Sequence, residues 1–359
     1  MSAKQQFADS FSRTPQAIGH AWGRVNLIGE HLDYNGGMVL PAPIKRHIEV
    51  AMAFANADHD EIQSNAFADT VKRSTAFELQ GDWSDYVAAS LALARKLGLH
   101  YEPVSVAIYS DIPAGAGVSS SAALIVATLR AVLDLNGFHA RAKPSDKIIA
   151  QWAQGVENEY IGVPCGIMDQ IAVSVTELGQ AIALDTETLE HSLVALPKDY
   201  RFSVVHSGVT RKLDEGRYAE RRQQCEDAAA KLNVPLLCKM TEEQSSSIEQ
   251  LAEPLRGRAR HVFTEHQRVL RAIDMLAQGE VHEFGKLMDL SHESMRDDFE
   301  ISVLEIDRLV ASCRQYGAVG ARMTGGGFGG CIVACIAAAD FSEWSKKLLA
   351  AHPAAKIIC

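Results

Sequence analysis

The sequence predicts a protein of about two domains in which helices and strands are mixed. The chain has 359 residues, of which 47% are hydrophobic and 22% are charged, a composition typical of globular proteins with sizeable cores. The first half alternates strand-like runs with helical spacing, whereas the second half is mainly helical and ends in a glycine-rich loop, a strand and a helix. We expect a boundary near residue 190, which divides the chain into domains 1–190 and 191–359.

Hydrophobic periodicity assigns most of the elements. Strand-like runs lie at 46–55, 104–113, 181–185, 202–208 and 331–337. Helical spacing lies at 82–98, 119–135, 145–160, 215–232, 258–279, 281–298 and 303–317.

Charge, apolar content and cysteine usage exclude several classes of protein. The formal charge of −10 argues against a general nucleic-acid binder. Neither a signal-peptide core nor an apolar run of membrane-spanning length is present. The seven cysteines contain no CxxC pair, which disfavours structural zinc and a disulfide framework. These features predict a reduced, cytoplasmic protein that binds neither nucleic acid nor membranes.

The segment GRVNLIGEHLDYNGG at 23–37 begins with strand-like alternation and ends in crowded polarity. Arg24 lies upstream, and Glu30, His31 and Asp33 follow before two glycines. Such a cluster at the end of a strand offers many hydrogen-bonding groups to a polar ligand.

The segment DIPAGAGVSSSAALIVA at 111–127 combines a strand end, a turn rich in small residues and a helix opened by three serines. Exposed amides and the helix dipole favour an anion at such a place. The alternative is a flexible turn with a redundant helix cap. The segment lacks the Gly-Lys-Ser/Thr ending of a Walker A loop.

Two further segments offer candidate chemistry. Glu157 and Asp169 lie in GVENEYIGVPCGIMDQIA at 155–172, where they could serve as a metal ligand and a proton acceptor or remain solvated acids. RMTGGGFGGC at 322–331 has five glycines around Phe328, which indicates either close approach to a ligand or another loop, or a linker.

In this order, the segments resemble those of the GHMP family of small-molecule kinases, and within it the galactokinases. The resemblance rests on 23–41, 113–124 and 163–170, and on 215–226, 291–307 and 322–331. It implies a two-domain α+β fold with a ribosomal-S5-like N-terminal domain and a ferredoxin-like C-terminal domain, and an active site between them. It also implies ATP-dependent phosphorylation of a sugar, D-galactose first of all, at its anomeric C1 hydroxyl.

The resemblance also implies roles for individual residues. Asp169 matches the family's catalytic aspartate and Arg24 the arginine beside it. The carboxylate would either accept the hydroxyl proton or orient the hydroxyl. Arg24 would hold that carboxylate ionised and stabilise charge on the transferred phosphoryl group. The positions that match sugar contacts are Glu30, His31, Asp33, Gly166, Asp169 and Tyr218.

The family's phosphate loop matches Gly115, Gly117, Ser119, Ser120 and Ser121. Ser120 and Glu157 resemble its Mg²⁺-binding pair, and hard oxygen ligands suit that ion. Trp83 and Tyr86 are placed near the adenine of ATP, with a core stripe of the helix as the alternative.

Two positions depart from the galactokinase pattern. Leu32 replaces the usual threonine between His31 and Asp33, and Trp22 replaces the usual proline before Gly23. Both leave the kinase chemistry unaffected and bear on the identity of the sugar. A kinase for another aldose, such as N-acetylgalactosamine or L-arabinose, is therefore one alternative. A non-catalytic sensor of galactose and ATP is the other, which the intact Ser121-Ala122 and the presence of Asp169 disfavour. We expect a monomer or a weak homodimer.

Overall fold

The chain forms two compact units that do not follow a single cut of the sequence. The computed structural model describes residues 2–113, 116–138, 143–175, 177–209 and 215–359. Unit 1 is made of Met1–Arg24, Ile44–Ala114 and Ser119–Val175, and unit 2 of Val25–Pro43, Gly115–Val118 and Thr176–Cys359. The units differ from the expected domains 1–190 and 191–359 because the polar segment 25–43 belongs with the second half of the chain.

Unit 1 is built on a five-stranded sheet. In spatial order the strands are β1 (Ala17–Asn26), β3 (Pro41–Phe54), β6 (Val104–Ser110), β4 (Asp60–Ser64) and β5 (Val71–Arg73). β6 pairs antiparallel with β3 and parallel with β4. The first residues of β3 and the last residues of β1 pass into unit 2.

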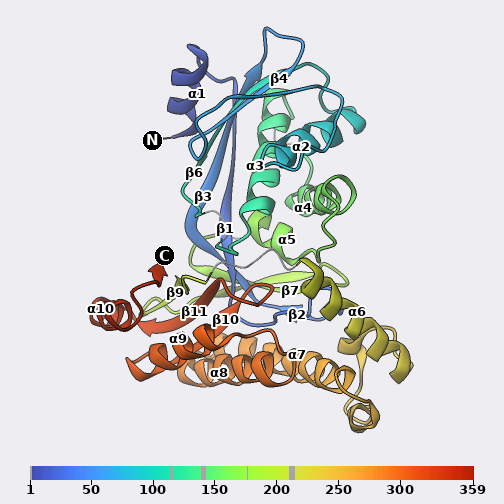
Figure 1. Ribbon diagram of the computed structural model, residues 1–359, viewed down its shortest axis with the longest axis vertical. Helices are drawn as coiled ribbons and strands as arrows, with labels where there is room; N and C mark the ends of the chain where they lie inside the picture. The colour runs from blue at the N-terminus through green and yellow to red at the C-terminus, as the bar shows by residue number, and fades with distance from the viewer. Residues whose placement is uncertain (1, 114–115, 139–142, 176, 210–214) are drawn as a thin grey trace. The chain divides into compact units, whose positions relative to one another are not determined.

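Helices lie on both faces of this sheet (Figure 1). They are α1 (Ala3–Phe11), α2 (Asp85–Lys96), α3 (Ser120–Leu135), α4 (Asp146–Gly155) and α5 (Met168–Val175), with the π-helix η1 (Val156–Ile161) directly after α4. Phe7 of α1 packs on Ala51, Ala53 and Ala107 of the sheet. Small residues at these strand positions let a short helix lie close to the sheet.

Unit 2 contains two sheets and a group of helices. One sheet has the order β10 (Gly320–Thr324), β11 (Cys331–Ala337), β9 (Tyr200–His206) and β12 (Lys356–Ile357), and the other β2 (Met38–Val39), β7 (Gln180–Asp185) and β8 (His191–Ala195). The helices are α6 (Glu215–Leu232), α7 (Leu255–Ala277), α8 (Val281–Asp297), α9 (Leu304–Gln315) and α10 (Phe341–Ala351), with 3₁₀ turns η2 (Leu237–Lys239) and η3 (Ser245–Gln250).

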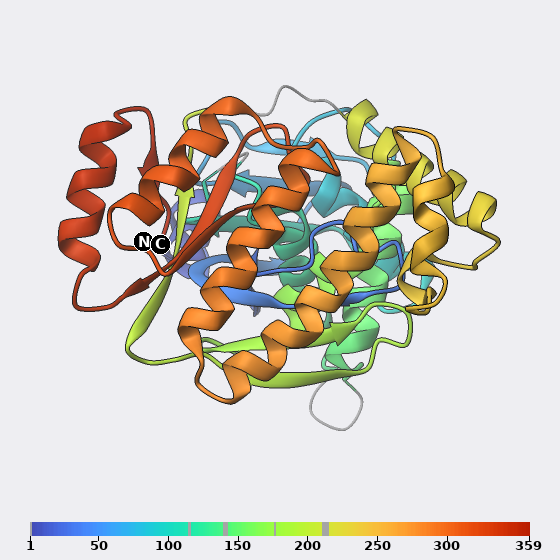
Figure 2. The ribbon, with the colours of Figure 1, turned by 90° about the horizontal axis from the view of Figure 1, so that it is seen from below.

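Two long helices of unit 2, α7 and α8, lie side by side (Figure 2). Helix α8 also packs on β10, and α9 packs on both β10 and β11. Phe284 and Met288, one turn apart on α8, are fully buried, as expected for the core-facing stripe of an amphipathic helix. This packing fixes the strand from which the glycine-rich segment 325–330 departs.

The helices expected from periodicity are confirmed, with ends shifted by a few residues. The expected helix 145–160 is present as α4 followed by the π-helix η1, because one wider turn is inserted where Glu157 lies. Helices α1 and α5 and the strands β2, β4, β5, β8, β10 and β12 were not predicted. These are short, and they depend on neighbouring strands or on the sheet face for their burial.

The described residues were compared with the expectations for membrane-spanning helices and for cysteines. None of their helices combines the length and the apolar character needed to cross a membrane. All seven cysteines lie in the described part of the chain, and every one is a free thiol.

Candidate active site

The expected catalytic pair, Arg24 and Asp169, is in direct contact within unit 1. Arg24 lies in β1, and Asp169 lies in the first turn of α5, where the positive end of the helix dipole favours an anion. Arg24 donates from Nε to Oδ1 and from Nη2 to Oδ2 of Asp169, both over 2.7 Å. The arginine is buried, whereas the aspartate side chain keeps 31% of its surface exposed. The carboxylate is therefore held in orientation and remains accessible.

Ser119 contacts the same carboxylate. Its hydroxyl donates to Asp169 Oδ2 over 2.6 Å. Ser119 precedes α3 in a left-handed conformation with φ 59°, and its side chain forms no capping hydrogen bond to the helix. The first amides of a helix have no partner within it, so the start of α3 keeps donors that suit an anion. One serine of the triplet therefore positions the acid, while the helix start remains suited to phosphate.

Glu157 is a buried carboxylate whose described partners are neutral. Ser121 Oγ donates to its Oε1 over 2.7 Å, and Gln170 Nε2 donates to its Oε2. The Cys165 thiol lies 3.7 Å from Oε2. Burial raises the pKa of Glu157, and the nearby charge of Asp169 raises it further. A buried carboxylate without a cationic partner is costly, so this oxygen-rich position fits a small divalent cation.

The other residues expected at the nucleotide lie in different surroundings. Trp83 stacks on Phe67, with ring centroids 4.8 Å apart and planes 3° apart. Trp83 and Tyr86 are both partly exposed, so they do not form a buried stripe of α2. Gly117 adopts a positive φ of 72°, and Gly115 lies outside the described residues. Ser120 is the first residue of α3.

The two members of the expected metal pair, Ser120 and Glu157, do not contact each other in the described residues. The hydrogen bond that Glu157 accepts from this part of the chain comes instead from the neighbouring serine, Ser121. The described residues also contain no group of three or more His, Cys, Asp or Glu side chains arranged around a metal. A Mg²⁺ ion that is held mainly by phosphates and water needs only one or two protein carboxylates.

Several residues expected at the sugar lie in unit 2. The His31 ring is 5.3 Å from the ring of Tyr218 and 4.7 Å from that of Phe299, measured between centroids. The Tyr34 hydroxyl lies 2.8 Å from His31 Nδ1. His31 itself has a left-handed φ of 63°, which a non-glycine residue keeps only when its surroundings hold it.

Two expected sugar residues complete the set. Asp33 is partly exposed in unit 2, and Gly166 is buried in unit 1, three positions before Asp169. The expected sugar contacts therefore come from both compact units, and each unit presents its own group.

Glu30 is held by the start of the glycine-rich segment. Its Oε1 accepts a hydrogen bond from the Gly325 amide over 2.7 Å and lies 3.0 Å from the Thr324 hydroxyl. Arg322 Nη1 lies 3.6 Å from the same oxygen. Glu30 is only 2% exposed. This carboxylate is thus fixed by an amide, a hydroxyl and a buried guanidinium.

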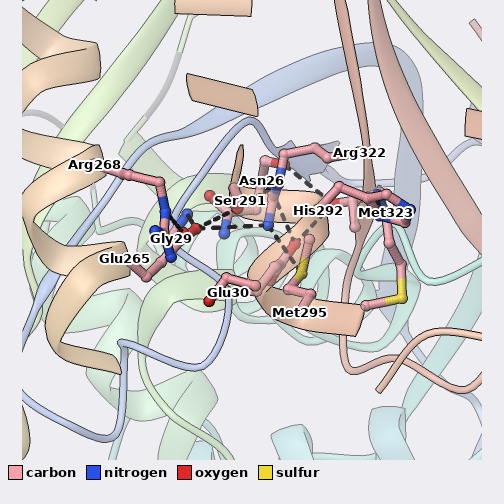
Figure 3. Close-up of polar contacts among 12 residues, drawn as sticks. Asn26, Gly29, Glu30, Glu265, Arg268, Ser291, His292, Met295, Arg322 and Met323 are labelled. Atoms are coloured by element: carbon pink, nitrogen blue, oxygen red, sulfur yellow. Dashed lines mark hydrogen bonds and ion pairs between the residues drawn. The ribbon is translucent and has the colours of Figure 1, made fainter. Parts of the chain in front are cut away.

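A buried charge cluster lies behind Glu30 (Figure 3). Arg322 donates from Nε to Ser291 Oγ, which donates to Glu265 Oε1 over 2.6 Å. The same Glu265 oxygen accepts from the Gly29 amide over 2.9 Å. Burial alone would raise the pKa of Glu265, but the Arg268 and Arg322 guanidiniums lower it to about 2. The cluster connects β10, α8 and α7 to the loop that carries Glu30.

The two positions that depart from the family pattern are occupied by packed side chains. Leu32 has no exposed surface, so its side chain has no surface to offer a ligand. Trp22 is partly exposed and lies against His20 and His47, with ring centroids 4.5 and 5.6 Å away. The expected influence of these residues on the sugar has no contact to support it.

Sequence reasoning did not assign the supporting residues of either group. Ser119 was assigned to the nucleotide rather than to Asp169, and Tyr34, Thr324 and Arg322 were not singled out as supports. Arg322 carries the only local signal, a cation in an otherwise apolar strand directly before a glycine-rich loop. Its partners are distant in sequence, so local pattern could not identify them.

Sequence models of three known regions match this chain. The galactokinase galactose-binding signature matches residues 5–54, the GHMP kinase N-terminal domain 85–177, and the GHMP kinase C-terminal domain 272–348. The matched regions include Arg24, Glu30 and Asp169.

Curated relatives and solved structures agree. The galactokinase of Thermotoga maritima is 37% identical over 332 residues, which cover 92% of each chain, and that of Thermotoga neapolitana is 36% identical over the same length and coverage. The crystal structure of Lactococcus lactis galactokinase complexed with galactose matches with a TM-score of 0.90 and 30% identity, covering 99% of this chain and 95% of that one. Methanococcus jannaschii mevalonate kinase shares the fold, with a TM-score of 0.69 and 20% identity over 96% of this chain and 98% of that one.

The fold, with the arginine–aspartate pair and a serine-opened helix in one of its units, is that of a GHMP small-molecule kinase. Within this class, the identity to the galactokinases and the coverage of both chains assign the family. The chain belongs to the galactokinase family.

Proposed function

We propose that this protein transfers the γ-phosphoryl group of ATP to the anomeric C1 hydroxyl of D-galactose, giving α-D-galactose 1-phosphate and ADP. The observation that carries the proposal is the accessible Asp169 carboxylate, held in two-point contact by Arg24. The galactose in the matched Lactococcus lactis complex and the galactose-binding signature support this choice of sugar.

In this proposal Asp169 acts on the sugar hydroxyl. Its carboxylate either accepts the proton as the new O–P bond forms or orients the hydroxyl for attack. Arg24 fixes the plane of the carboxylate, and its positive charge favours the negative charge that develops on the transferred group. Ser119 restrains Oδ2 through its hydroxyl. Positioning and electrostatics supply most of the catalysis expected for phosphoryl transfer.

The nucleotide is proposed to bind at the start of α3. The amides at this helix start, together with Gly117, Ser120 and Ser121, would contact the phosphates, with Gly115 as a further proposed contact outside the described residues. Trp83 and Tyr86 would contact the adenine. A Mg²⁺ ion bound between Glu157 and the phosphates would neutralise phosphate charge during transfer. The proposed ligands of that ion are Ser120 and Glu157, and Ser121 orients the Glu157 carboxylate.

The sugar hydroxyls are proposed to bind Glu30, His31, Asp33, Gly166, Asp169 and Tyr218. Carboxylates accept hydrogen bonds from hydroxyls, and imidazole or phenol groups can donate or accept them. A site that pairs each hydroxyl rejects an epimer because a buried polar group is then left unpaired. The hydrogen bonds that fix Glu30 and His31 support this kind of recognition.

Two other functions are compatible with the contacts among Arg24, Asp169 and Ser119. A kinase for another aldose would share the catalytic pair and differ in its sugar contacts. A non-catalytic sensor would bind galactose and ATP without turnover; the intact pairing of Arg24, Asp169 and Ser119 favours catalysis over this alternative.

A panel of aldoses distinguishes these proposals. ADP release with ATP, Mg²⁺ and D-galactose, D-glucose, N-acetylgalactosamine or L-arabinose gives kcat/KM for each sugar. We expect the highest value with D-galactose, and at least about 100-fold discrimination against its epimer D-glucose, since a buried polar group is left unpaired. Preference for another sugar would refute the proposed substrate, and absence of turnover with every sugar would favour the sensor.

We further propose a reducing compartment such as the cytoplasm, which the seven free thiols support. We also propose a monomer or weak homodimer, which light scattering coupled to size-exclusion chromatography would measure.

A further inference from the structure

We propose that residues 324–328, the last residue of β10 and the start of the glycine-rich segment, form a positioning element for sugar recognition, with Gly326 setting the place of Tyr218. This inference rests on the proposed function, because it takes Glu30 and Tyr218 as sugar contacts. It assigns the segment to the sugar, whereas glycine-rich loops in kinases commonly cover phosphates. The segment, Glu30 and Tyr218 all belong to unit 2.

The first contact is with Glu30. The Gly325 amide donates to Glu30 Oε1 over 2.7 Å, and the Thr324 hydroxyl lies 3.0 Å from the same oxygen and 3.1 Å from the Asn26 carbonyl. Hydrogen bonds to an ionised acceptor are stronger than neutral ones and more directional. They hold one oxygen of Glu30 in place and leave the other oxygen outside these contacts.

The second contact is with Tyr218. A Cβ added at Gly326 would lie 3.2 Å from Tyr218 Cδ2 and 3.7 Å from Cε2. The backbone of Gly326 is not in the left-handed region, unlike that of Gly327 with its φ of 91°. Alanine is therefore compatible with the backbone of Gly326, and the cost of its methyl group falls on the tyrosine ring.

The segment cannot withdraw from Tyr218, because it is anchored on both sides of Gly326. The Gly325 amide is bonded to Glu30, and the Phe328 amide donates to the Ile301 carbonyl over 2.7 Å. Beyond Gly326, a Cβ at Gly327 would lie 2.7 Å from Ile301 Cβ. A methyl group at Gly326 must therefore displace the Tyr218 ring, which itself lies 5.3 Å from the His31 ring.

The residue directly after the glycine-rich segment, Cys331, has a different contact. The Cys331 thiol donates to the carbonyl of Ala116, in the phosphate-loop segment, over 2.8 Å. A role of residues 324–328 in nucleotide binding is therefore the competing interpretation. The Michaelis constants for sugar and for ATP, measured separately, distinguish the two.

The experiment compares Gly326→Ala with the wild-type chain. We expect the KM for galactose to rise about tenfold, the effect of one methyl group on a sugar pocket, while kcat and the KM for ATP change less than about twofold. In a Tyr218→Ala background, where the ring is absent, G326A should have no further effect on the galactose KM. An unchanged galactose KM, or an ATP KM that rises as much, would overturn the inference.

Thr324 provides an independent variant. Thr324→Val removes the hydroxyl near Glu30 and keeps the shape of the side chain, so the galactose KM should rise about tenfold. Thr324→Ser retains the hydroxyl and should restore most of the affinity. Equal loss in both variants would show that packing, not the hydrogen bond, is responsible, and would overturn this part of the inference.

Gly155→Ala is the matched control. Gly155 has helical backbone angles, and the nearest atom to an added Cβ is 3.9 Å away. This variant should leave both Michaelis constants unchanged.

Failure of the proposed function is recognised separately. Calorimetric titration of wild-type and G326A protein with galactose measures binding without turnover. If the wild type binds galactose and does not phosphorylate it, the kinase proposal fails, and the ratio of the two dissociation constants decides the inference. Wild-type protein that neither binds nor phosphorylates any aldose overturns both.

Discussion

Two carboxylates that lie beside buried arginines, Asp169 in unit 1 and Glu30 in unit 2, are built in opposite ways. Arg24 contacts Asp169 directly through two hydrogen bonds, and 31% of the aspartate side chain stays exposed. Arg322 lies 3.6 Å from Glu30, which is 2% exposed and is held by a backbone amide. One carboxylate is accessible for a reaction, and the other is fixed within a scaffold.

The two arginines also differ in whether solvent reaches their acid partners. Arg24 has an acid partner that solvent also reaches, so solvent can stabilise the partner if the arginine is lost. Arg322 is surrounded by Glu30, Glu265 and Ser291 without exposed surface. Removal of Arg322 would leave the buried Glu30 carboxylate without its guanidinium and Glu265 with Arg268 alone, which is strongly unfavourable. A similar pairing of side chains therefore leaves the carboxylate of Asp169 accessible in one unit and holds that of Glu30 in a fixed place in the other.

The largest expected effect tests the reactive side of this comparison. Asp169→Ala and Asp169→Asn should lower kcat by at least about 10³-fold, because the group that accepts the proton or orients the hydroxyl is lost. ATP binding, measured by calorimetry in the absence of sugar, should survive. A variant that retains more than a tenth of the wild-type kcat would refute the role of Asp169.

The next largest effect is expected when each arginine in turn is replaced by methionine and the two variants are compared. Arg322→Met should lower the free energy of unfolding by roughly 3–5 kcal/mol, because the buried Glu30 loses its guanidinium partner and Glu265 retains only Arg268. Arg24→Met should lower it by about 1 kcal/mol or less, since Asp169 is partly exposed, while reducing kcat by about 100-fold.

Urea unfolding and steady-state kinetics of both variants give this comparison. Equal losses of stability in the two variants would contradict the expectation that the exposure of the acid partner determines how much each arginine stabilises the fold. A kcat unchanged in Arg24→Met would remove its proposed catalytic role.

The smallest expected effect concerns pH and the support of the Glu30 loop. His261 Nε2 lies 3.3 Å from the Glu30 carbonyl, and burial lowers the pKa of His261 from 6.5 to about 4. Between these values the unfolded chain binds a proton that the folded protein does not. The contribution of His261 to stability is therefore present above pH 6.5 and is lost as the pH falls toward 4, by on the order of 2 kcal/mol between pH 6.5 and 5.

The His261→Gln variant isolates this contribution, because glutamine cannot take up the proton. Urea midpoints at pH 7 and pH 5 should differ less in this variant than in the wild type. The same pH dependence in both proteins would show that His261 is not the responsible group.

The fold was largely predictable, because long helices carry their own periodicity. Helices α3, α6 and α8 lie where apolar spacing placed them. Strands such as β10 and β12 were not predicted, because they depend on neighbouring strands. The π-helix at Glu157 was also missed, since one inserted residue leaves little trace in a sequence.

The candidate site was predictable as a set of residues and not as a set of contacts. The contact between Arg24 and Asp169 agrees with the expected pair, whereas Glu157 is hydrogen-bonded to Ser121 and not to the expected Ser120. The expectation that Leu32 affects the sugar did not anticipate that its side chain is fully buried. Burial is decided by what packs on a residue, and sequence neighbours do not show this.

The sequence by itself determined the class of fold, the kinase family and the acids, serines and glycines that can carry its chemistry, because each of these is written in local order and residue type. Only the tertiary structure decided which hydroxyl holds Asp169, and which strand and loop hold Glu30. Ser119 and Asp169 are 50 positions apart, and Gly325 and Glu30 are 295 positions apart. Contacts over such separations depend on packing of the whole unit, which no local pattern encodes.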